Sequence, residues 1–324
     1  MAGPTMTTVG IQVFPGDGFI SPADLGRAVE DRGFEALFFP EHLHMPVERT
    51  IDFPIPIPLP EIYKRNFDPF LAFAAISSVT STLTFGTGIS LVAQRDPILL
   101  AKTIATLDHL CQGNFVLGVG AGWNVEEMKN HGVDPESRWG RVADHVQAMR
   151  TIWTQDVATH HGRFVNFDRI WSWPKPYGNR HVPVLIGGSA RNFARILRWA
   201  DGWIPALDGD VDILVAEIGQ LRTLAADRHG GIELDITVAV GYGRNLTAPE
   251  LKKLCAARVK RVLLAINPGS YAETTAALDE AASVARQAGW HHERLFLPGH
   301  AAEEAVVHLV PLDPTGYRGT PLHQ

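Results

Sequence analysis

The chain has 324 residues, 45% of them hydrophobic and 20% charged, so it can bury a large core as one barrel or as two ordinary domains. A formal net charge of -6 gives no basic surface for nucleic acid or an anionic membrane, so we expect a small-molecule partner. Cys111 and Cys255 lack metal-type spacing, and the N-terminal MAGPTMTTVG lacks a secretion pattern. No run reaches the roughly eighteen apolar residues of a membrane helix, so we expect a cytoplasmic protein.

Short apolar strands alternate with amphipathic helices along the chain. The expected strands are residues 8–14, 35–39, 83–89, 115–119, 183–186, 202–205, 234–240 and 259–266. The expected helices are residues 21–32, 68–79, 97–110, 139–153 and 190–200, one ending at 228, then 247–256 and 270–287. Eight strands, each followed by a helix, predict a (β/α)8 TIM barrel over residues 1–288 rather than an open sheet.

Three segments depart from this alternation. Residues 40–66 follow the second strand and contain FPIPIPLP, whose prolines exclude both a helix and a regular ladder. So long a loop is either a functional lid or pocket wall, or a surface excursion on the barrel rim. Residues 155–181, in the unit of the fourth strand, are expected to form an irregular insertion or a hairpin. Residues 289–324, rich in His, Pro and Gly, are expected to form an irregular C-terminal extension.

The end of the fourth strand is the first candidate site, because active sites of such barrels lie at the carboxyl ends of the strands. Here Gly118, Gly120 and Gly122 leave backbone that a flat ligand can approach. Trp123 and Asn124 add a ring and a hydrogen-bonding amide. A tight turn without a ligand explains the glycines equally well.

Two further strand ends carry chemistry. Glu41 and His42 follow the second strand, and an imidazole beside a carboxylate suits proton transfer near neutral pH; alternatively, His42 only ties down the long loop. Gly187, Gly188 and Ser189 follow the fifth strand and precede a helix, where free N–H groups and a hydroxyl can hold a phosphate. An ordinary strand-to-helix turn has the same pattern.

A metal site is the alternative chemistry at the second strand. His42 and His44 form an HxH pair, a familiar start of the metal site in hydrolytic TIM barrels. Such a site needs further ligands at later strand ends, yet the fifth strand ends in Gly-Gly-Ser and the eighth in Asn267. We therefore predict no metal.

Several motifs carry a family resemblance. They are LTFGTGISLVAQRDPILLAKTIATLDHLCQGNFVLGVGAGWN, Glu126-Glu127, Arg138, WPKP at 173–176, VPVLIGGS at 182–189 and RWADGWIP at 198–205. Together they resemble the bacterial luciferase-like oxidoreductases, and most closely the branch that uses the deazaflavin coenzyme F420. The resemblance covers about residues 8–266. It implies a TIM barrel, a flavin-type ring at the barrel mouth, a coenzyme phosphate near the fifth strand, and commonly a homodimer.

The resemblance also implies roles for single residues near the second and third strands. The family's strand-two histidine falls on His42, which follows Glu41 where many relatives have aspartate. A strand-three bulge that props the ring, often built on a non-proline cis peptide, falls on Gly88-Ile89. We expect this peptide to protrude toward the barrel mouth.

At the fourth and fifth strands, the family's asparagine falls on Asn124 and its phosphate-side glycines on Gly187 and Gly188. One position departs from the pattern. Sugar-phosphate dehydrogenases of this family carry a catalytic glutamate in the strand-four glycine run, where this chain has Ala121. Their substrate and their acid therefore do not transfer.

The resulting hypothesis is a redox enzyme that transfers hydride between F420 and an unidentified small organic substrate. An FMN-dependent monooxygenase is the alternative, followed by a non-catalytic flavin-binding protein and a metal-dependent TIM-barrel hydrolase. The predicted catalytic residues are His42 and Glu41. The predicted cofactor-binding residues are Gly88, Ile89, Gly120, Trp123, Asn124, Gly187, Gly188 and Ser189.

Overall fold

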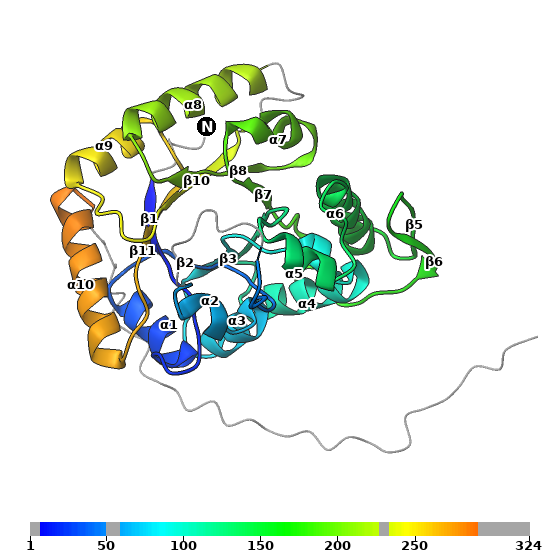
Figure 1. Cartoon of the computed structure of the whole chain (residues 1–324), viewed down its shortest axis with the longest axis horizontal. Coiled ribbons are helices and arrows are strands. Elements are labelled where there is room, and N and C mark those ends of the chain that lie inside the picture. Colours follow the sequence, from blue (N-terminus) through cyan, green and yellow to red (C-terminus); the bar gives the residue numbers. More distant parts are fainter. Residues whose placement is uncertain (1–6, 50–58, 227–232, 291–324) are drawn as a thin grey trace, which may run out of the picture. The chain divides into compact units, whose positions relative to one another are not determined.

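Eight parallel strands close into a barrel in the computed structural model, which describes residues 7–49, 59–226 and 233–290 (Figure 1). In their order around the barrel they are β1 (Thr8–Gln12), β2 (Ala36–Phe39), β3 (Thr84–Thr87), β4 (Phe115–Val119), β7 (Val184–Gly187), β8 (Gly202–Ile204), β10 (Asp235–Val240) and β11 (Arg261–Ala265). Pairing of Thr8 with Arg261 brings β11 beside β1 and closes the ring. A two-residue strand, β9 (Ala206–Leu207), follows β8 and pairs with β10. The predicted (β/α)8 barrel is confirmed.

Helices surround the strands, and most begin where the sequence places a capping side chain. They are α1 (Pro22–Asp31), α3 (Pro69–Ser77), α4 (Pro97–Leu110), α6 (Arg138–Thr154), α7 (Phe193–Trp199), α8 (Val211–Ala225), α9 (Ala248–Ala256) and α10 (Tyr271–Gln287). Asp68 and Asp96, for example, accept backbone N–H groups at the starts of α3 and α4, each followed by a proline that suits a first helical position. A short 3-10 turn, η3 (Ala190–Asn192), leads into α7.

Several shorter elements lie outside the repeating pattern. They are α2 (Ile62–Arg65), η1 (Val92–Gln94), α5 (Val125–Asn130), β5 (Ala158–His161), β6 (Asn166–Ile170) and η2 (Tyr177–Asn179). The antiparallel β5–β6 pair confirms the predicted hairpin, and Figure 1 shows it beyond α6, away from the barrel strands. The sequence did not predict α2 or α5. Much of the proline-rich stretch, residues 50–58, lies outside the described residues.

The barrel interior is a packed core and not a pore. Phe38 points inward and fills the space that Gly86 leaves on the neighbouring strand. The inward cluster consists of Ala36, Phe38, Val116, Leu185, Ile204 and Leu263. A larger apolar layer, including the fully buried Phe39 and Phe73, packs between the strands and the helices. With the interior filled, open space for a ligand remains at the ends of the barrel.

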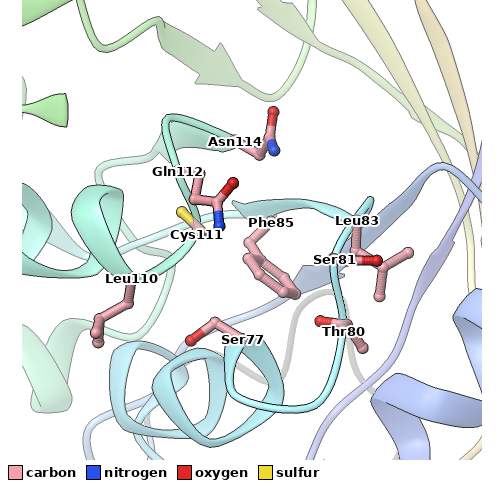
Figure 2. Close-up of a pocket in the computed structure, with 9 residues that line it drawn as sticks. All are labelled: Ser77, Thr80, Ser81, Leu83, Phe85, Leu110, Cys111, Gln112 and Asn114. Atoms are coloured by element: carbon pink, nitrogen blue, oxygen red, sulfur yellow. The ribbon is translucent and has the colours of Figure 1, made fainter. Parts of the chain in front are cut away.

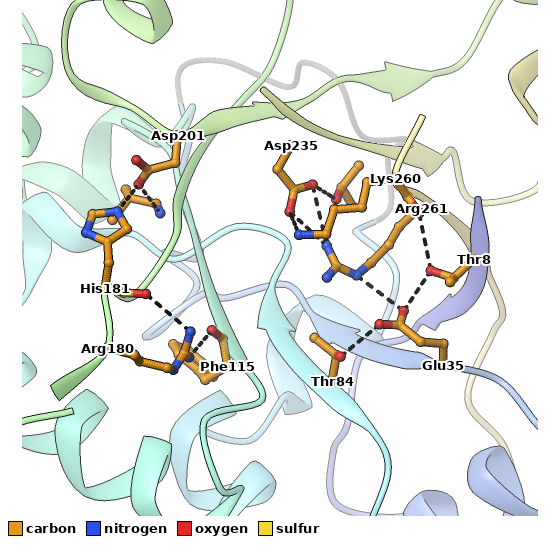
Figure 3. A network of polar contacts seen from close by, with 12 residues as sticks. Thr8, Glu35, Thr84, Phe115, Arg180, His181, Asp201, Asp235, Lys260 and Arg261 are labelled. Carbon is orange, nitrogen blue, oxygen red and sulfur yellow. Dashed lines mark hydrogen bonds and ion pairs between the residues drawn. The ribbon is translucent and has the colours of Figure 1, made fainter. Parts of the chain in front are cut away.

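Charged groups tie the strands together at their amino ends (Figure 3). Glu35 accepts hydrogen bonds from Thr8 (2.9 Å) and Thr84 (2.8 Å), the first residues of β1 and β3. Arg261, at the start of β11, pairs with Glu35 (3.3 Å) and with Asp235 of β10 (3.1 Å). This network spans five neighbouring strands at the end opposite the carboxyl strand ends, so its residues contribute to stability rather than to a site.

Asp235 is the most buried carboxylate of this network. Burial by itself raises the pKa of a carboxyl group, but Arg261 and Lys260 outweigh it and lower the pKa of Asp235 below its ordinary value. The ionised form is therefore the one that the folded protein stabilises.

The expected absence of a membrane helix and the expected C-terminal extension concern the rest of the chain. No helix among the described residues is long and apolar enough to cross a membrane. The predicted C-terminal extension begins at residue 289, and residues 291–324 lie outside the described residues. The division at residue 288 therefore stays a prediction.

Candidate active site at the barrel mouth

The carboxyl ends of the strands form one end of the barrel, which we call the mouth. His42 lies there, three residues after β2, with only 7% of its side chain exposed. Its Nδ1 lies 2.9 Å from Oε2 of Glu127 in α5, and the other oxygen of Glu127 accepts the N–H of Leu43 (3.1 Å). A carboxylate on Nδ1 fixes the imidazole and leaves Nε2 for other partners. No hydrogen bond to Nε2 of His42 is present among the described residues.

Glu41 faces a different set of partners, so the expected pairing of Glu41 with His42 is wrong. Its fully buried carboxylate accepts hydrogen bonds from Ser90 (2.6 Å), the N–H of Leu91 (2.7 Å) and Nε of Arg95 (2.7 Å). A second guanidinium nitrogen of Arg95 also contacts Glu41, and it reaches Asp68 at 2.6 Å. Because its oxygens are occupied by protein donors, Glu41 positions the connections after β2 and β3.

The Gly88-Ile89 peptide is cis, as the sequence led us to expect for this position. The N–H of Gly88 donates to the carbonyl of Phe39 (2.8 Å), and the N–H of Ser90 donates to the carbonyl of Gly118 (2.8 Å). The residues before and after Ile89 are therefore hydrogen-bonded to the neighbouring strands. The side chain of Ile89 lies against the barrel-interior cluster and is partly buried. The protrusion of this peptide toward the mouth and its contact with a coenzyme ring stay predictions.

Two of the predicted glycines make room for this side chain. A Cβ on Gly120 would lie 2.6 Å from Cδ1 of Ile89, and a Cβ on Gly187 would lie 2.5 Å from its Cγ2. Gly118 lies against the carbonyl of Thr87. The atoms that lie closest to Gly118 and Gly120 belong to Thr87 and Ile89 of the protein itself. The expectation that the backbone of these glycines is open to a ligand is therefore wrong. A contact between Gly120 and a coenzyme stays a prediction.

Trp123 and Asn124 differ in what they present to the mouth. Asn124 is 1% exposed and caps α5, accepting the N–H of Glu127 (3.0 Å), while its amide nitrogen reaches the sulfur of Met45 (3.2 Å). Its amide is thus used inside the protein. The Trp123 ring lies edge-on to His42, with centroids 5.7 Å apart, and stays half-buried.

The turn after β7 matches the predicted phosphate loop only in part. The N–H of Gly188 (φ +105°) donates to the carbonyl of Ile204 (3.1 Å), so it is not free as we expected. The Gly187 carbonyl accepts the amide of Asn192 (3.0 Å). Ser189 is exposed and its hydroxyl makes no capping bond. What remains for a ligand here is this hydroxyl and the exposed backbone.

Aromatic rings continue from His42 across the mouth. Tyr63 of α2 lies 5.6 Å from His42 and 4.8 Å from Phe14, and Phe14 lies 5.4 Å from Tyr242, all measured between ring centroids. With Trp123 at the other end, these rings form a row that we call the aromatic row. They come from the connections after β1, β2, β4 and β10.

Two buried polar atoms near this row have no hydrogen-bond partner among the described residues. They are the hydroxyl of Tyr242 and Oε1 of Gln12, the last residue of β1. The Gln12 carboxamide lies beside Gly88, and it lies near the Tyr242 hydroxyl without the geometry of a hydrogen bond. Burial raises the pKa of Tyr242 well above its ordinary value, and Tyr63 adds to this, so the hydroxyl remains a donor. Buried unpaired polar atoms are costly, so these two atoms are candidate contacts for a ligand.

Among the described residues, no three His, Cys, Asp or Glu side chains come together as metal ligands require. His44, the second member of the HxH pair, instead contacts Asn130 (2.9 Å) and His131 (3.3 Å) near the end of α5. This contact ties the loop after β2 to α5.

A small hollow lies far from the mouth, at the amino ends of β3 and β4 (Figure 2). Its volume of about 30 Å³ suits a single water molecule. Burial raises the pKa of Cys111 in its wall to about 11, so this thiol is not a nucleophile at neutral pH. The lining residues are Ser77, Thr80, Ser81, Leu83, Phe85, Leu110, Cys111, Gln112 and Asn114.

The sequence did not assign roles to several residues that the mouth brings together. Glu127 follows the cap Asn124 by three residues, a spacing typical of helix starts that signals its position but not its contact with His42. Gln12 is a polar residue inside an apolar strand, which is the signal that identifies it. Tyr63 and Arg95 carry no comparable signal, because their partners are distant in sequence.

Comparisons with known proteins give the family context. Residues 17–294 match the family described as luciferase-like monooxygenase. An uncharacterized protein of Mycobacterium tuberculosis is 44% identical over 209 residues, which are 63% of this chain and 73% of that protein. An FMNH2-dependent dimethylsulfone monooxygenase of Pseudomonas fluorescens is 27% identical over 147 residues, 44% of this chain and 40% of the relative.

Two solved structures share the fold. The monooxygenase RslO1 from Streptomyces bottropensis superimposes with a TM-score of 0.70 at 16% identity, covering 86% of this chain and 98% of that one. An F420-dependent secondary alcohol dehydrogenase, solved with an F420–acetone adduct, superimposes with a TM-score of 0.66 at 15% identity, covering 87% of this chain and 99% of that one. At these identities the likeness concerns the barrel alone.

Proposed function

The chain belongs to the luciferase-like monooxygenase family, an oxidoreductase class, and on that premise we propose that it transfers hydride between the deazaflavin F420 and a small organic substrate at the barrel mouth. The observation that carries the proposal is the buried His42–Glu127 pair, which leaves Nε2 of His42 for a substrate. The choice of F420 rests on the motif resemblance and is supported by F420-dependent enzymes among the structural neighbours. The second candidate, an FMN-dependent monooxygenase, is favoured by the dimethylsulfone monooxygenase relative.

The residues of the mouth fit a ring of this kind. The pyrimidine edge of a flavin or deazaflavin alternates carbonyl acceptors with an N–H donor. Tyr242 offers a hydroxyl donor and Gln12 an oxygen acceptor, and both atoms are buried and unpaired among the described residues. Ile89 is packed against the barrel-interior cluster, and the apolar surface that it leaves exposed would lie against a ring face. At the other end of the coenzyme, the exposed Ser189 hydroxyl would contact the phosphate.

The chemistry divides between the coenzyme and the chain. When bound, F420 supplies a ring carbon that accepts or donates hydride. Glu127 keeps the Nδ1 proton of His42 in place, so that Nε2 accepts a proton from the substrate as hydride leaves it, or returns one in the reverse direction. Trp123 and Tyr63 flank the imidazole and limit its contact with water. Glu41 holds the backbone after β3 and takes no part in the proton transfer.

The first experiment identifies the coenzyme. Purified apoprotein is titrated with F420 and with FMN while fluorescence is followed, and we expect saturation by F420 and a much weaker response to FMN. A clear preference for FMN would overturn the assignment and favour the monooxygenase. Analytical ultracentrifugation of the same sample tests the expected homodimer.

The second experiment tests His42. We expect His42→Ala to slow single-turnover reduction of bound coenzyme by about 10² to 10⁴, the usual contribution of a general acid or base. His42→Gln keeps a hydrogen-bonding side chain but cannot move a proton near neutral pH, so it should bind coenzyme better than the alanine variant and stay slow. Normal turnover in His42→Gln would exclude obligatory proton transfer. No turnover of any candidate substrate by the wild type would favour a non-catalytic binding protein.

A further inference from the structure

A second pocket lies beside the mouth, between η1, the start of α4, the first half of α6 and the turn of the β5–β6 hairpin. Its volume is about 370 Å³, which is in the range of small-molecule sites. Its lining residues are Ala93, Gln94, Arg95, Asp96, Pro97, Ile98, His131, Arg141, His145, Phe164, Val165 and Asn166. None of the residues proposed to bind the coenzyme lines it.

Gln94 in the wall of this pocket is 8% exposed, and neither its Nε2 nor its Oε1 has a hydrogen-bond partner among the described residues. Gly122 lies against the amide and leaves it room, since a Cβ there would stand 3.4 Å from Nε2. A buried carboxamide has one donor group and one acceptor to satisfy. Leaving both unpaired is destabilising, so Gln94 indicates a ligand with complementary groups.

Arg141, one helical turn before His145 on α6, is the charged counterpart of Gln94. Its Nε is buried without a partner, and no ion pair or hydrogen bond of its guanidinium is present among the described residues. Its guanidinium instead lies over the Phe164 ring, 5.2 Å from the centroid. A partly desolvated guanidinium without a counterion favours a carboxylate, which it can bind through two parallel hydrogen bonds.

The other ionisable groups of the wall do not replace that counterion. Arg95 is neutralised by Glu41 and Asp68, and Asp96 accepts a backbone N–H at the start of α4. Burial lowers the pKa of both His131 and His145, so both rings are neutral at pH 7.

From these observations we propose that this pocket binds a small organic hydroxycarboxylate. Its carboxylate pairs with Arg141, its hydroxyl donates to Oε1 of Gln94, and its apolar body lies against Phe164 and Pro97. An inorganic anion would satisfy Arg141 but would leave the apolar wall of Phe164 and Pro97 without a partner. The site is separate from the coenzyme site and does not depend on the redox assignment.

Calorimetric titration of the full-length chain tests the proposal with 3-phenyllactate as the probe. We expect saturable binding of one molecule per chain, weaker binding of 3-phenylpropionate, which lacks the hydroxyl, and none of 3-phenyl-1,2-propanediol, which lacks the carboxylate. Saturating F420 should not displace the probe. Absence of saturable phenyllactate binding, or competition with F420, would overturn the separate carboxylate site.

Three variants connect the binding to these residues. Arg141→Gln and Gln94→Leu should each weaken phenyllactate binding by about tenfold or more, the loss expected for a hydrogen bond to a charged or buried partner. The matched control is Arg163→Gln, because Arg163 also stacks on Phe164 (5.0 Å) but does not line the pocket, and it should bind normally. Without ligand, Gln94→Leu should melt no lower than the wild type. A lower melting temperature, equal losses in all three variants, or phosphate binding as tight as that of phenyllactate would each refute the proposal.

Discussion

The Ile89 side chain and the two glycines that receive it give a test of how the mouth is built. An alanine at position 187 would bring its Cβ within 2.5 Å of Cγ2 of Ile89, and an alanine at 120 within 2.6 Å of Cδ1 and 2.8 Å of Cγ1. Forcing an extra methyl group into a packed place typically costs about 1 to 3 kcal/mol. Cδ1 can turn about χ2, whereas Cγ2 moves only with χ1 or the backbone. We therefore expect Gly187→Ala to destabilise more than Gly120→Ala.

A double-mutant cycle with Ile89→Ala isolates this contact. Ile89→Ala removes Cγ1, Cγ2 and Cδ1, so either glycine variant should cost little in its presence. The coupling free energy between Ile89 and Gly187 should then equal most of the penalty, about 1 to 3 kcal/mol. Urea unfolding of the wild type, the three single variants and the two double variants measures these values.

Additive effects within about 0.5 kcal/mol would refute the reasoning, because residues that do not touch combine independently. A larger loss in Gly120→Ala than in Gly187→Ala would contradict the argument from side-chain rotation. Gly209 is a matched control, since a Cβ there meets no heavy atom within 4 Å. Gly209→Ala should show no coupling with Ile89→Ala.

Three further predictions concern single side chains. The folded-state pKa of Asp235 lies below its unfolded value of about 3.9, so the Asp235–Arg261 pair stabilises the fold above that pH and loses this effect as pH falls through the lower, folded value. In urea unfolding from pH 7 downward, the unfolding free energy of Asp235→Asn should therefore fall less steeply with pH than that of the wild type. The same pH dependence in both proteins would exclude this contribution. Glu41→Gln should cost about 1 to 3 kcal/mol of unfolding free energy, because an amide cannot accept all the hydrogen bonds of the buried carboxylate while Arg95 keeps only its pair with Asp68. A loss under about 1 kcal/mol in urea melts would contradict this role. Tyr242→Phe should leave apoprotein stability unchanged or higher while weakening F420 binding in a fluorescence titration, whereas lower stability with unchanged affinity would give the hydroxyl a structural role.

The barrel itself was predictable because its signals are local. Strands such as β10 and β11 are apolar runs, and helices such as α4 and α10 begin with capping side chains. The two helices that escaped prediction are too short for an apolar periodicity, although α5 does begin with the cap Asn124. α2 has four residues, none of them buried, and α5 has six, with an acidic first turn. Their positions depend on tertiary contacts.

The mouth was predictable by position but not by contact. Adjacent side chains at a strand end point in different directions, so Glu41 and His42 do not share a partner although they are neighbours in sequence. Glu41 meets Arg95, 54 residues later, and His42 meets Glu127, 85 residues later. Spacing along the chain carries no information about such pairs. The same holds for the glycines, where the sequence indicated close approach but not that Ile89 is what approaches.

The order of the ion pairs along the chain bears on how the protein is made. The charged contacts of Glu41 and His42, including Arg95, Asp68 and Glu127, all lie between residues 41 and 127, within the first four strand–helix units. Gln12 meets Tyr242 only when β10 has joined the barrel. During synthesis on the ribosome, all the residues of these ion pairs therefore emerge before the last strands do. The proposed site for the coenzyme ring is complete only after the C-terminal third has joined the barrel.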